Sequence, residues 1–227
     1  MRSSPDSAVG DFGQTRSQSP TAESGLDLIY HGTLTGLYGV DVAIRAVKEA
    51  RDLGLPVRFT VLGHGPERGR LQHLVTVLGL ADAVTFETPI VQSALPARLR
   101  RCSAGVVPTR LDGMTRYSLS NKLLEYVHLG LPVLAASLPS YRRYLGENAL
   151  WYWTPGDSQD LTRAIAEFAI ASPEDRRHRA RLAQEAVAPI VWIREQAKLL
   201  AAYDELLAPR VASASTAATR SAARPSP

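Results

Sequence analysis

Residues 120–137 (SNKLLEYVHLGLPVLAAS) predict a loop, a short helix that ends at Gly130, and a buried strand that begins at Pro132. Lys122 falls in the first turn of this helix, where the helix dipole favours an anion, and Glu125 follows one turn later on the same face. Lys before Glu is also the weaker order for a helical ion pair. A departure from local rules where a strand meets a helix is typical of a ligand site, and a cation and an acid so placed suit a phosphorylated ribose. A solvated Lys–Glu pair on the helix surface is the alternative.

The same alternation of short apolar runs and longer helical stripes continues on both sides of this stretch. Five or six strand–helix repeats predict right-handed crossovers and a mainly parallel sheet with helices on both faces. The expected fold class is therefore α/β, with a Rossmann-like parallel sheet. The expected strands are 28–30, 57–62, 84–86, 104–107, 132–135 and 149–153, and the expected helices are 40–53, 66–78, 93–101, 122–129, two that begin after the N-caps Asp157 and Ser172, and 193–206.

The chain of 227 residues is long enough for one large domain, and its hydrophobic content of 45% supports a core. The two ends do not share this content. Residues 1–25 are rich in Ser, Gly, Gln and Thr, and residues 209–227 form a tail of Ala, Ser, Arg and Pro, so both are predicted to be disordered. Residues 26–208 are left for a single Rossmann-like domain that binds the ligand.

The composition argues against several classes of protein. The pI of about 9.4 suggests a nucleic acid partner, but the arginines concentrate in the C-terminal tail and at 176–181, without aromatic residues between them for base stacking. We therefore expect no nucleic acid partner, while peripheral contact with an anionic membrane surface stays open. The single Cys102 excludes an internal disulfide, and the five histidines lack the spacing of a zinc site, so no metal is expected. No segment resembles a signal peptide or a membrane span, which favours a cytoplasmic protein.

Four predicted loops each follow a strand, so all should lie at one edge of the sheet, where such folds bind ligands: 32–39, 63–68, 109–121 and 137–141. The first of these is rich in glycine and could bring backbone amides to a diphosphate. The run that begins at Gly63 resembles a dinucleotide fingerprint, but Arg68 stands where a third glycine is needed, which disfavours a dehydrogenase. For each glycine alone, a turn required by backbone geometry is an equal alternative.

The third loop is long and polar, and loops of this length in a compact domain are often functional. Its Arg110 or Arg116 could meet a phosphate, and its small polar side chains could bind sugar hydroxyls, although a plain exposed loop is the alternative. The candidate ligand-binding residues from all loops are Gly32, Thr33, Tyr38, Gly63, Gly65, Pro66, Asp112, Thr115, Ser118 and Asn121.

Four segments, in order and spacing, resemble the nucleotide-sugar-binding half of GT-B glycosyltransferases, specifically glycosyltransferase family 4. The resemblance spans residues 28–207 and is specific only as a linked set. The segments are His31-Gly-Thr-Leu with Tyr38-Gly-Val-Asp, Val61-Leu-Gly-His-Gly-Pro-Glu with residues 78–86, Ser120-Asn-Lys-Leu-Leu-Glu-Tyr with Gly130-Leu-Pro-Val, and Pro155-Gly-Asp before an apolar helix.

The resemblance implies roles for particular residues. Glu125 matches the acid that binds the ribose hydroxyls in that family. Tyr117 occupies the position of the family's preceding acid, and Thr33 and Tyr38 occupy the positions of its two basic residues at the donor phosphates. This chain therefore lacks that acid and that basic pair. Lys122 would supply the missing positive charge. Lys122 and Glu125 are thus the expected catalytic residues.

The implied function is the retaining transfer of a sugar from a nucleotide-diphosphate sugar to a saccharide or a lipid-linked acceptor, with this chain as the donor-binding half and no further cofactor. The acceptor-binding half normally precedes this one, and residues 1–25 are too few to form it, so a separate acceptor-binding domain or chain is an expected partner. Two alternatives stay open. They are a non-catalytic nucleotide-sugar-binding module of a truncated or split enzyme, and a nucleotide-sugar epimerase.

Overall fold

The computed structural model describes residues 25–190 and 192–207. The tails predicted at 1–25 and 209–227 lie outside the described residues, apart from Gly25. The chain divides after Ala188 into two compact units, so the single domain expected at 26–208 spans both. The second unit contains helix α8 (Trp192–Leu207), which is described only by itself. No helix in the described ranges is long and apolar enough to cross a membrane.

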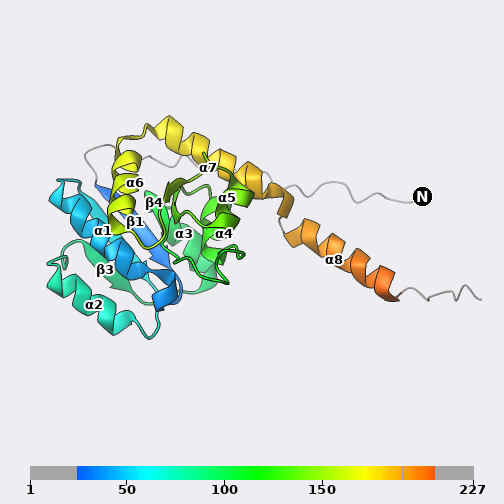
Figure 1. Cartoon of the computed structure of the whole chain (residues 1–227), viewed down its shortest axis with the longest axis horizontal. Helices are drawn as coiled ribbons and strands as arrows, with labels where there is room; N and C mark the ends of the chain where they lie inside the picture. The colour runs from blue at the N-terminus through cyan, green and yellow to red at the C-terminus, as the bar shows by residue number, and fades with distance from the viewer. Residues whose placement is uncertain (1–24, 191, 208–227) are drawn as a thin grey trace, which may run out of the picture. The chain divides into compact units, whose positions relative to one another are not determined.

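The first unit is built on six parallel strands in the order β3-β2-β1-β4-β5-β6. Strands β1, β3 and β4 are labelled in Figure 1, among the helices that surround the sheet. The predicted α/β, Rossmann-like class is therefore confirmed. The strand order reverses between the neighbours β1 and β4, and parallel α/β sheets bind ligands beyond the strand ends at such a point. The strands are β1 (Leu26–His31), β2 (Val57–Leu62), β3 (Val84–Glu87), β4 (Ala104–Val107), β5 (Val133–Ala136) and β6 (Trp151–Trp153).

Helices cover both faces of the sheet. On one face α1 packs against α2 and α6, over alternate strand residues such as Leu28 and Phe59, and on the other α4 and α5 pack with α7. The α-helices of this unit are α1 (Val40–Asp52), α2 (Arg68–Val77), α3 (Leu95–Leu99), α4 (Asn121–His128), α5 (Pro139–Leu145), α6 (Ser158–Ile170) and α7 (Pro173–Val187), with short 3-10 turns at Gly36–Tyr38 and Gln92–Ala94. A further 3-10 turn, Ala188–Ile190, falls at the division between the two units.

The helix boundaries follow local signals in two cases and depart from them in two others. The predicted N-caps are confirmed, because Asp157 accepts from the Asp160 amide and Ser172 from the Asp175 amide. Helix α2 starts at Arg68 rather than at Pro66, because the Gly65 carbonyl accepts from the Arg68 amide in a tighter turn, at 3.1 Å, and the first helical bond runs from the Leu71 amide to the Glu67 carbonyl, at 2.9 Å. Helix α5 replaces most of the loop expected at 137–141.

The arginines of α7 are partly occupied by internal contacts. Arg176 donates to the carbonyls of Phe168 and Ala169 at 2.7 and 2.9 Å, which satisfies the end of α6. Arg179 stacks on Trp151 with 4.7 Å between its guanidinium carbon and the ring centroid. These two side chains therefore help to hold α7 to the rest of the unit and leave the outer face of α7 less basic than its sequence suggests.

Candidate functional site

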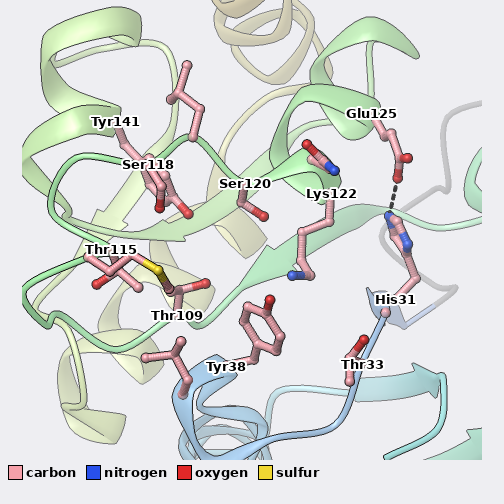
Figure 2. A pocket seen from close by; sticks show the side chains of 15 residues that line it. His31, Thr33, Tyr38, Thr109, Thr115, Ser118, Ser120, Lys122, Glu125 and Tyr141 are labelled. Carbon is pink, nitrogen blue, oxygen red and sulfur yellow. Dashed lines mark ion pairs between the residues drawn. The ribbon is translucent and has the colours of Figure 1, made fainter.

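A pocket of about 360 Å³ lies beyond the carboxyl ends of β1, β4 and β5, where the strand order reverses. It brings together the first turn of α4, the turn after β1, the long loop after β4, and Tyr141 of α5 (Figure 2). The lining residues are His31, Gly32, Thr33, Leu37, Tyr38, Thr109, Met114, Thr115, Ser118, Leu119, Ser120, Asn121, Lys122, Glu125 and Tyr141.

The amino end of α4 borders the pocket without a side-chain cap. Ser120 occupies the N-cap position in an extended conformation, but its hydroxyl accepts no bond from the helix. The first amides of a helix have no partner within the helix, and together they carry a partial positive charge. This end of α4 can therefore receive an anion.

Lys122 is a buried cation that lines the pocket, with 8% of the residue exposed. Its ammonium nitrogen lies 4.0 Å from the centre of the Tyr38 ring and 5.3 Å from that of Tyr30, and no described carboxylate comes within 4.0 Å of it. Burial lowers the pKa of Lys122 from 10.5 to about 8, against the opposing effect of Glu125. Gly32 makes room for this side chain, because a β-carbon at position 32 would lie 3.3 Å from Lys122 Cε.

Glu125 lies one turn after Lys122, and its Oε2 is 3.0 Å from His31 Nε2 (Figure 2). The two atoms are close enough for an ion pair but are not aligned as a hydrogen bond. Burial, with the nearby Lys122 charge, lowers the pKa of His31 to about 4, so the imidazole is neutral at pH 7. Burial also raises the pKa of Glu125, while Gln92 and Lys122 act in the opposite direction.

Two buried polar atoms at the pocket are not satisfied. Three buried side-chain polar atoms in the described part of the chain lack a hydrogen-bond partner, and two of them, His31 Nε2 and Thr109 Oγ1, belong to pocket residues. Burial raises the pKa of the Tyr141 phenol, while the Thr109 and Ser120 hydroxyls act in the opposite direction. Because buried polar groups are normally paired, their concentration here indicates a polar ligand.

The structure brings eight of the twelve predicted site residues to this pocket. They are Gly32, Thr33, Tyr38, Thr115, Ser118, Asn121, Lys122 and Glu125. Thr115 is also a support of the long loop, since its buried hydroxyl donates to the Arg110 carbonyl at 2.8 Å.

The other four predicted residues lie outside the pocket lining. Gly63 and Gly65 pack directly behind the turn after β1, where β-carbons would lie 1.9 Å from the Gly32 oxygen and 2.4 Å from the Leu34 oxygen. Pro66 follows them in the same turn. The Asp112 carboxylate accepts bonds from the amides of Met114 and Thr115, at 2.8 and 2.7 Å, and so folds the loop upon itself.

Arg110 and Arg116, the two arginines predicted as possible phosphate ligands, contact other groups. Arg110 binds both carboxylate oxygens of Asp41, at 2.7 and 2.9 Å, and the Gly36 carbonyl at 3.0 Å. Arg116 lies over the Tyr117 ring, 5.9 Å from its centre. Lys122 is thus the one Lys or Arg among the described residues that line the pocket.

Sequence reasoning assigned no ligand role to several lining residues, among them His31, Thr109 and Tyr141. The position of His31 and Thr109 at or just after a strand end was an available signal. For Tyr141 that signal was weaker, because the helix that carries it was not predicted. No group of three His, Cys, Asp or Glu side chains that could hold a metal ion occurs within the described ranges.

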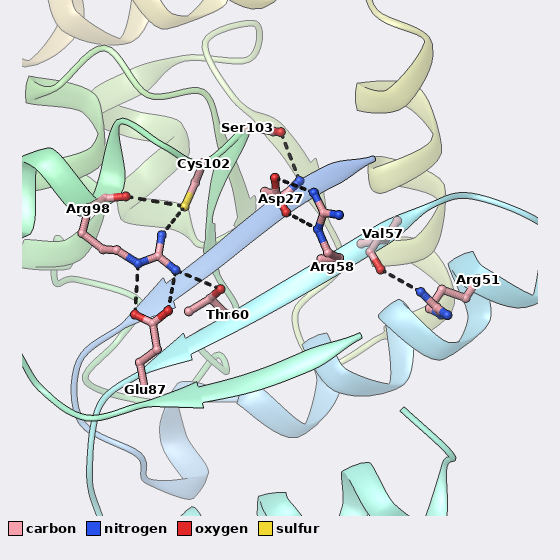
Figure 3. A network of polar contacts seen from close by, with 9 residues as sticks. All are labelled: Asp27, Arg51, Val57, Arg58, Thr60, Glu87, Arg98, Cys102 and Ser103. Atoms are coloured by element: carbon pink, nitrogen blue, oxygen red, sulfur yellow. Dashed lines mark hydrogen bonds and ion pairs between the residues drawn. The ribbon is translucent and has the colours of Figure 1, made fainter. Parts of the chain in front are cut away.

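A second polar cluster, whose residues are not part of the pocket lining, links strands β1 to β3 with helix α3 (Figure 3). Arg98 binds both oxygens of Glu87, at 2.7 and 3.0 Å, and also contacts Thr60 at 3.1 Å. Arg58 likewise binds both oxygens of Asp27. The charged groups here are already paired with each other, so the cluster has the character of a structural network and not of a ligand site.

Removing Arg98 should therefore destabilise the fold without affecting the pocket. We expect Arg98→Ala to lower the free energy of unfolding by about 1–3 kcal/mol, because it leaves the partly buried Glu87 without its partner. Urea denaturation would measure the loss. Arg100→Ala is the matched control, because it removes an exposed neighbour whose side chain makes no hydrogen bond or ion pair within the described residues. Equal effects of the two substitutions would contradict the structural role of the Arg98–Glu87 pair.

The fold and the pocket together define a Rossmann-like domain with a binding site at its topological switch point. Residues 25–170 match the family model described as glycosyl transferases group 1. The chain therefore belongs to this family of glycosyltransferases. The expected resemblance to the GT-B group is confirmed by the match and by the fold of the structures that it resembles.

Among curated proteins, the chain is 28% identical over 217 residues to a D-inositol 3-phosphate glycosyltransferase of Stackebrandtia nassauensis, covering 90% of this chain and 47% of that protein. Among solved structures, it resembles Anabaena Alr3699/HepE in complex with UDP and glucose, with a TM-score of 0.67 and 20% identity over 80% of this chain and 49% of the other. It also resembles the C-terminal domain of a group 1 glycosyl transferase (LpcC) from Francisella tularensis, with a TM-score of 0.59 and 16% identity over 72% of this chain and 84% of that domain. The chain spans about half the length of the curated relatives that it matches along most of its own length.

Proposed function

We propose that this chain is the donor-binding half of a retaining glycosyltransferase and that its pocket binds a nucleotide-diphosphate sugar. The observation that carries the proposal is the convergence of Lys122, Glu125 and the uncapped end of α4 on one pocket at the switch point of the sheet. A cation, a carboxylate and free amides at one site match the diphosphate and the ribose hydroxyls of such a donor.

Each part of the donor has a proposed place. Lys122 and the first amides of α4 hold the diphosphate, and Glu125 accepts hydrogen bonds from the ribose hydroxyls. Thr33, Thr115 and Ser118 offer hydroxyls at the same pocket for the transferred sugar. Because the similar Anabaena HepE structure is a complex with UDP and glucose, UDP is the first nucleotide to test.

The proposed chemistry is mainly electrostatic. As the bond between the sugar and the diphosphate breaks, negative charge grows on the leaving diphosphate, and a fixed cation and fixed amides lower the energy of that state. In the retaining reaction that we propose, the acceptor approaches on the face from which the diphosphate leaves, and the diphosphate oxygen assists removal of the acceptor proton. A saccharide or lipid-linked acceptor would be held by a separate acceptor-binding domain or chain, because this chain spans about half the length of its relatives.

Nucleotide binding by the purified chain tests the proposal. We expect UDP or GDP to bind measurably by isothermal titration calorimetry, and Glu125→Ala to lower the affinity between about tenfold and a hundredfold, the value of hydrogen bonds to a charged group. Glu185→Ala, at an exposed position of α7 outside the pocket, is the control. Failure of the wild-type chain to bind either nucleotide would overturn the proposal.

A non-catalytic nucleotide-sugar-binding module is the second candidate, favoured by the same half-length match. A measurement of sugar transfer distinguishes the donor-binding half of an enzyme from the non-catalytic module. We expect little or no donor hydrolysis or transfer by the chain alone, and transfer when an acceptor-binding partner is supplied. Binding without transfer under any such pairing would favour the module.

A further inference from the structure

We infer that His31 is a positioning residue for Glu125: it holds one carboxylate oxygen and so directs the other toward the ribose hydroxyls of the nucleotide. The inference deepens the proposed function and rests on it. It starts from the 3.0 Å contact between His31 Nε2 and Glu125 Oε2, which links the end of β1 to the helix that carries the proposed ribose ligand.

His31 is itself held by the surrounding fold. Its backbone amide donates to the Tyr126 hydroxyl at 3.1 Å, and that hydroxyl donates to the Ile29 carbonyl at 3.2 Å. The imidazole meets the Tyr126 ring edge to face, with 5.0 Å between centroids and 86° between planes. Tyr126 fits only because residue 105 is glycine, where a β-carbon would lie 2.4 Å from the ring. Tyr126 therefore holds the His31 imidazole in place, so that it can orient the neighbouring Glu125 carboxylate.

Glu125 has less support of its own. Its side chain is 36% exposed, whereas that of His31 is 11% exposed. A carboxylate at the rim of a pocket can turn, and one oxygen must face the ligand for a ribose diol to bind well. A fixed donor at one carboxylate oxygen restricts that rotation.

The charges around the pair favour a neutral donor at position 31. Lys122 faces both side chains, Gln92 approaches Glu125, and Tyr126 packs under the imidazole. A second cation beside Lys122 would be repelled and would neutralise the carboxylate. A neutral imidazole with its proton on Nε2 can donate to Glu125 Oε2 once the two groups are aligned, and it adds no charge. Its Nε2 has no aligned partner among the described residues, and we expect the alignment to improve when the nucleotide binds.

The test compares variants with and without a donor at the position of Nε2. Glutamine places an amide nitrogen near that point, methionine has a similar length but no donor, and asparagine is too short to reach. Affinities of the wild type, His31→Gln, His31→Met and His31→Asn would be measured for UDP and for 2′-deoxy-UDP, or for the guanosine pair if GDP binds more tightly. Thermal unfolding of each variant reports whether it folds.

We expect the wild type to prefer UDP over 2′-deoxy-UDP by about tenfold or more, the value of one hydrogen bond to a charged group. The preference should persist in His31→Gln and fall to about twofold or less in His31→Met and His31→Asn. If His31 had only a structural role, its replacement would weaken the binding of both nucleotides equally. An unchanged ratio of the two affinities in folded His31→Met and His31→Asn proteins would therefore overturn the inference and leave the proposed function standing. No nucleotide binding by the wild type would overturn both.

Discussion

Replacing Lys122 with methionine is expected to stabilise the fold while weakening the binding of a nucleoside diphosphate about a hundredfold or more. The ammonium group is buried without a paired carboxylate, and its pKa falls from 10.5 to about 8. At pH 7 this shift corresponds to a cost of about 3 kcal/mol for keeping the charge inside the protein. Methionine has a similar length and no charge, so it removes most of that cost. The same change removes the pocket's cation, and a desolvated charge pair of this kind contributes about 2–5 kcal/mol to binding.

Thermal unfolding and calorimetric titration with UDP would measure the two effects on the same samples. Lys48→Met is the control, because Lys48 forms an exposed pair with Asp52 on α1, outside the pocket lining. That substitution should change stability by less than about 1 kcal/mol and leave UDP affinity unaltered. A Lys122→Met protein that is less stable and binds UDP normally would show that this lysine serves the fold and not an anion.

The stability difference should also depend on pH in a definite direction. Because the pKa of Lys122 is lower in the folded state, the unfolded chain binds more protons between pH 8 and 10.5. The stability of the wild type relative to Lys122→Met should therefore rise across this window, and the advantage of the variant should disappear near its upper end. UDP affinity of the wild type should fall above about pH 8 as the ammonium loses its proton.

Gly63→Ala is expected to lower the free energy of unfolding by about 3 kcal/mol or more. A β-carbon at this position would lie 1.9 Å from the Gly32 carbonyl oxygen, and both partners are backbone, so neither can turn aside. Overpacking commonly costs about 1–3 kcal/mol, and a clash between backbones belongs at or beyond the upper end of that range. The forced shift would also move the turn above Lys122, and UDP binding should weaken with it.

Gly69→Ala offers a control from the same region of the chain. Gly69 lies in α2, and an added β-carbon there would meet no atom within 4 Å. Alanine in a helix should stabilise the protein by up to about 1 kcal/mol. Urea denaturation of both variants would compare them directly. A Gly63→Ala protein as stable as Gly69→Ala would mean that the two turns can separate, and that Gly63 is not needed for their packing.

Much of the architecture could be predicted because it depends on local patterns. The alternation of strands and helices, the N-caps Asp157 and Ser172, and the one-turn spacing of Lys122 and Glu125 are all readable within a few residues. Helix α5 has only seven residues, which is too short for an apolar stripe to distinguish it from a loop.

The details of the pocket depend on contacts between distant parts of the chain. His31 meets Glu125 only because β1 pairs with β4, which brings the end of β1 beside α4. Nothing near Arg110 in sequence indicates that this loop residue would bind Asp41, a residue of helix α1. Pairings of this kind follow from strand order and packing, and a single sequence does not record them.

The Arg110–Asp41 pair has a consequence for how a ligand would enter. Together with the Asp112 and Thr115 bonds, it anchors the long loop after β4 at several points before any ligand arrives. A loop that is already rigid loses little conformational entropy when a ligand binds. The pocket is thus preorganised, and a donor molecule should be captured without a slow closing motion of this loop.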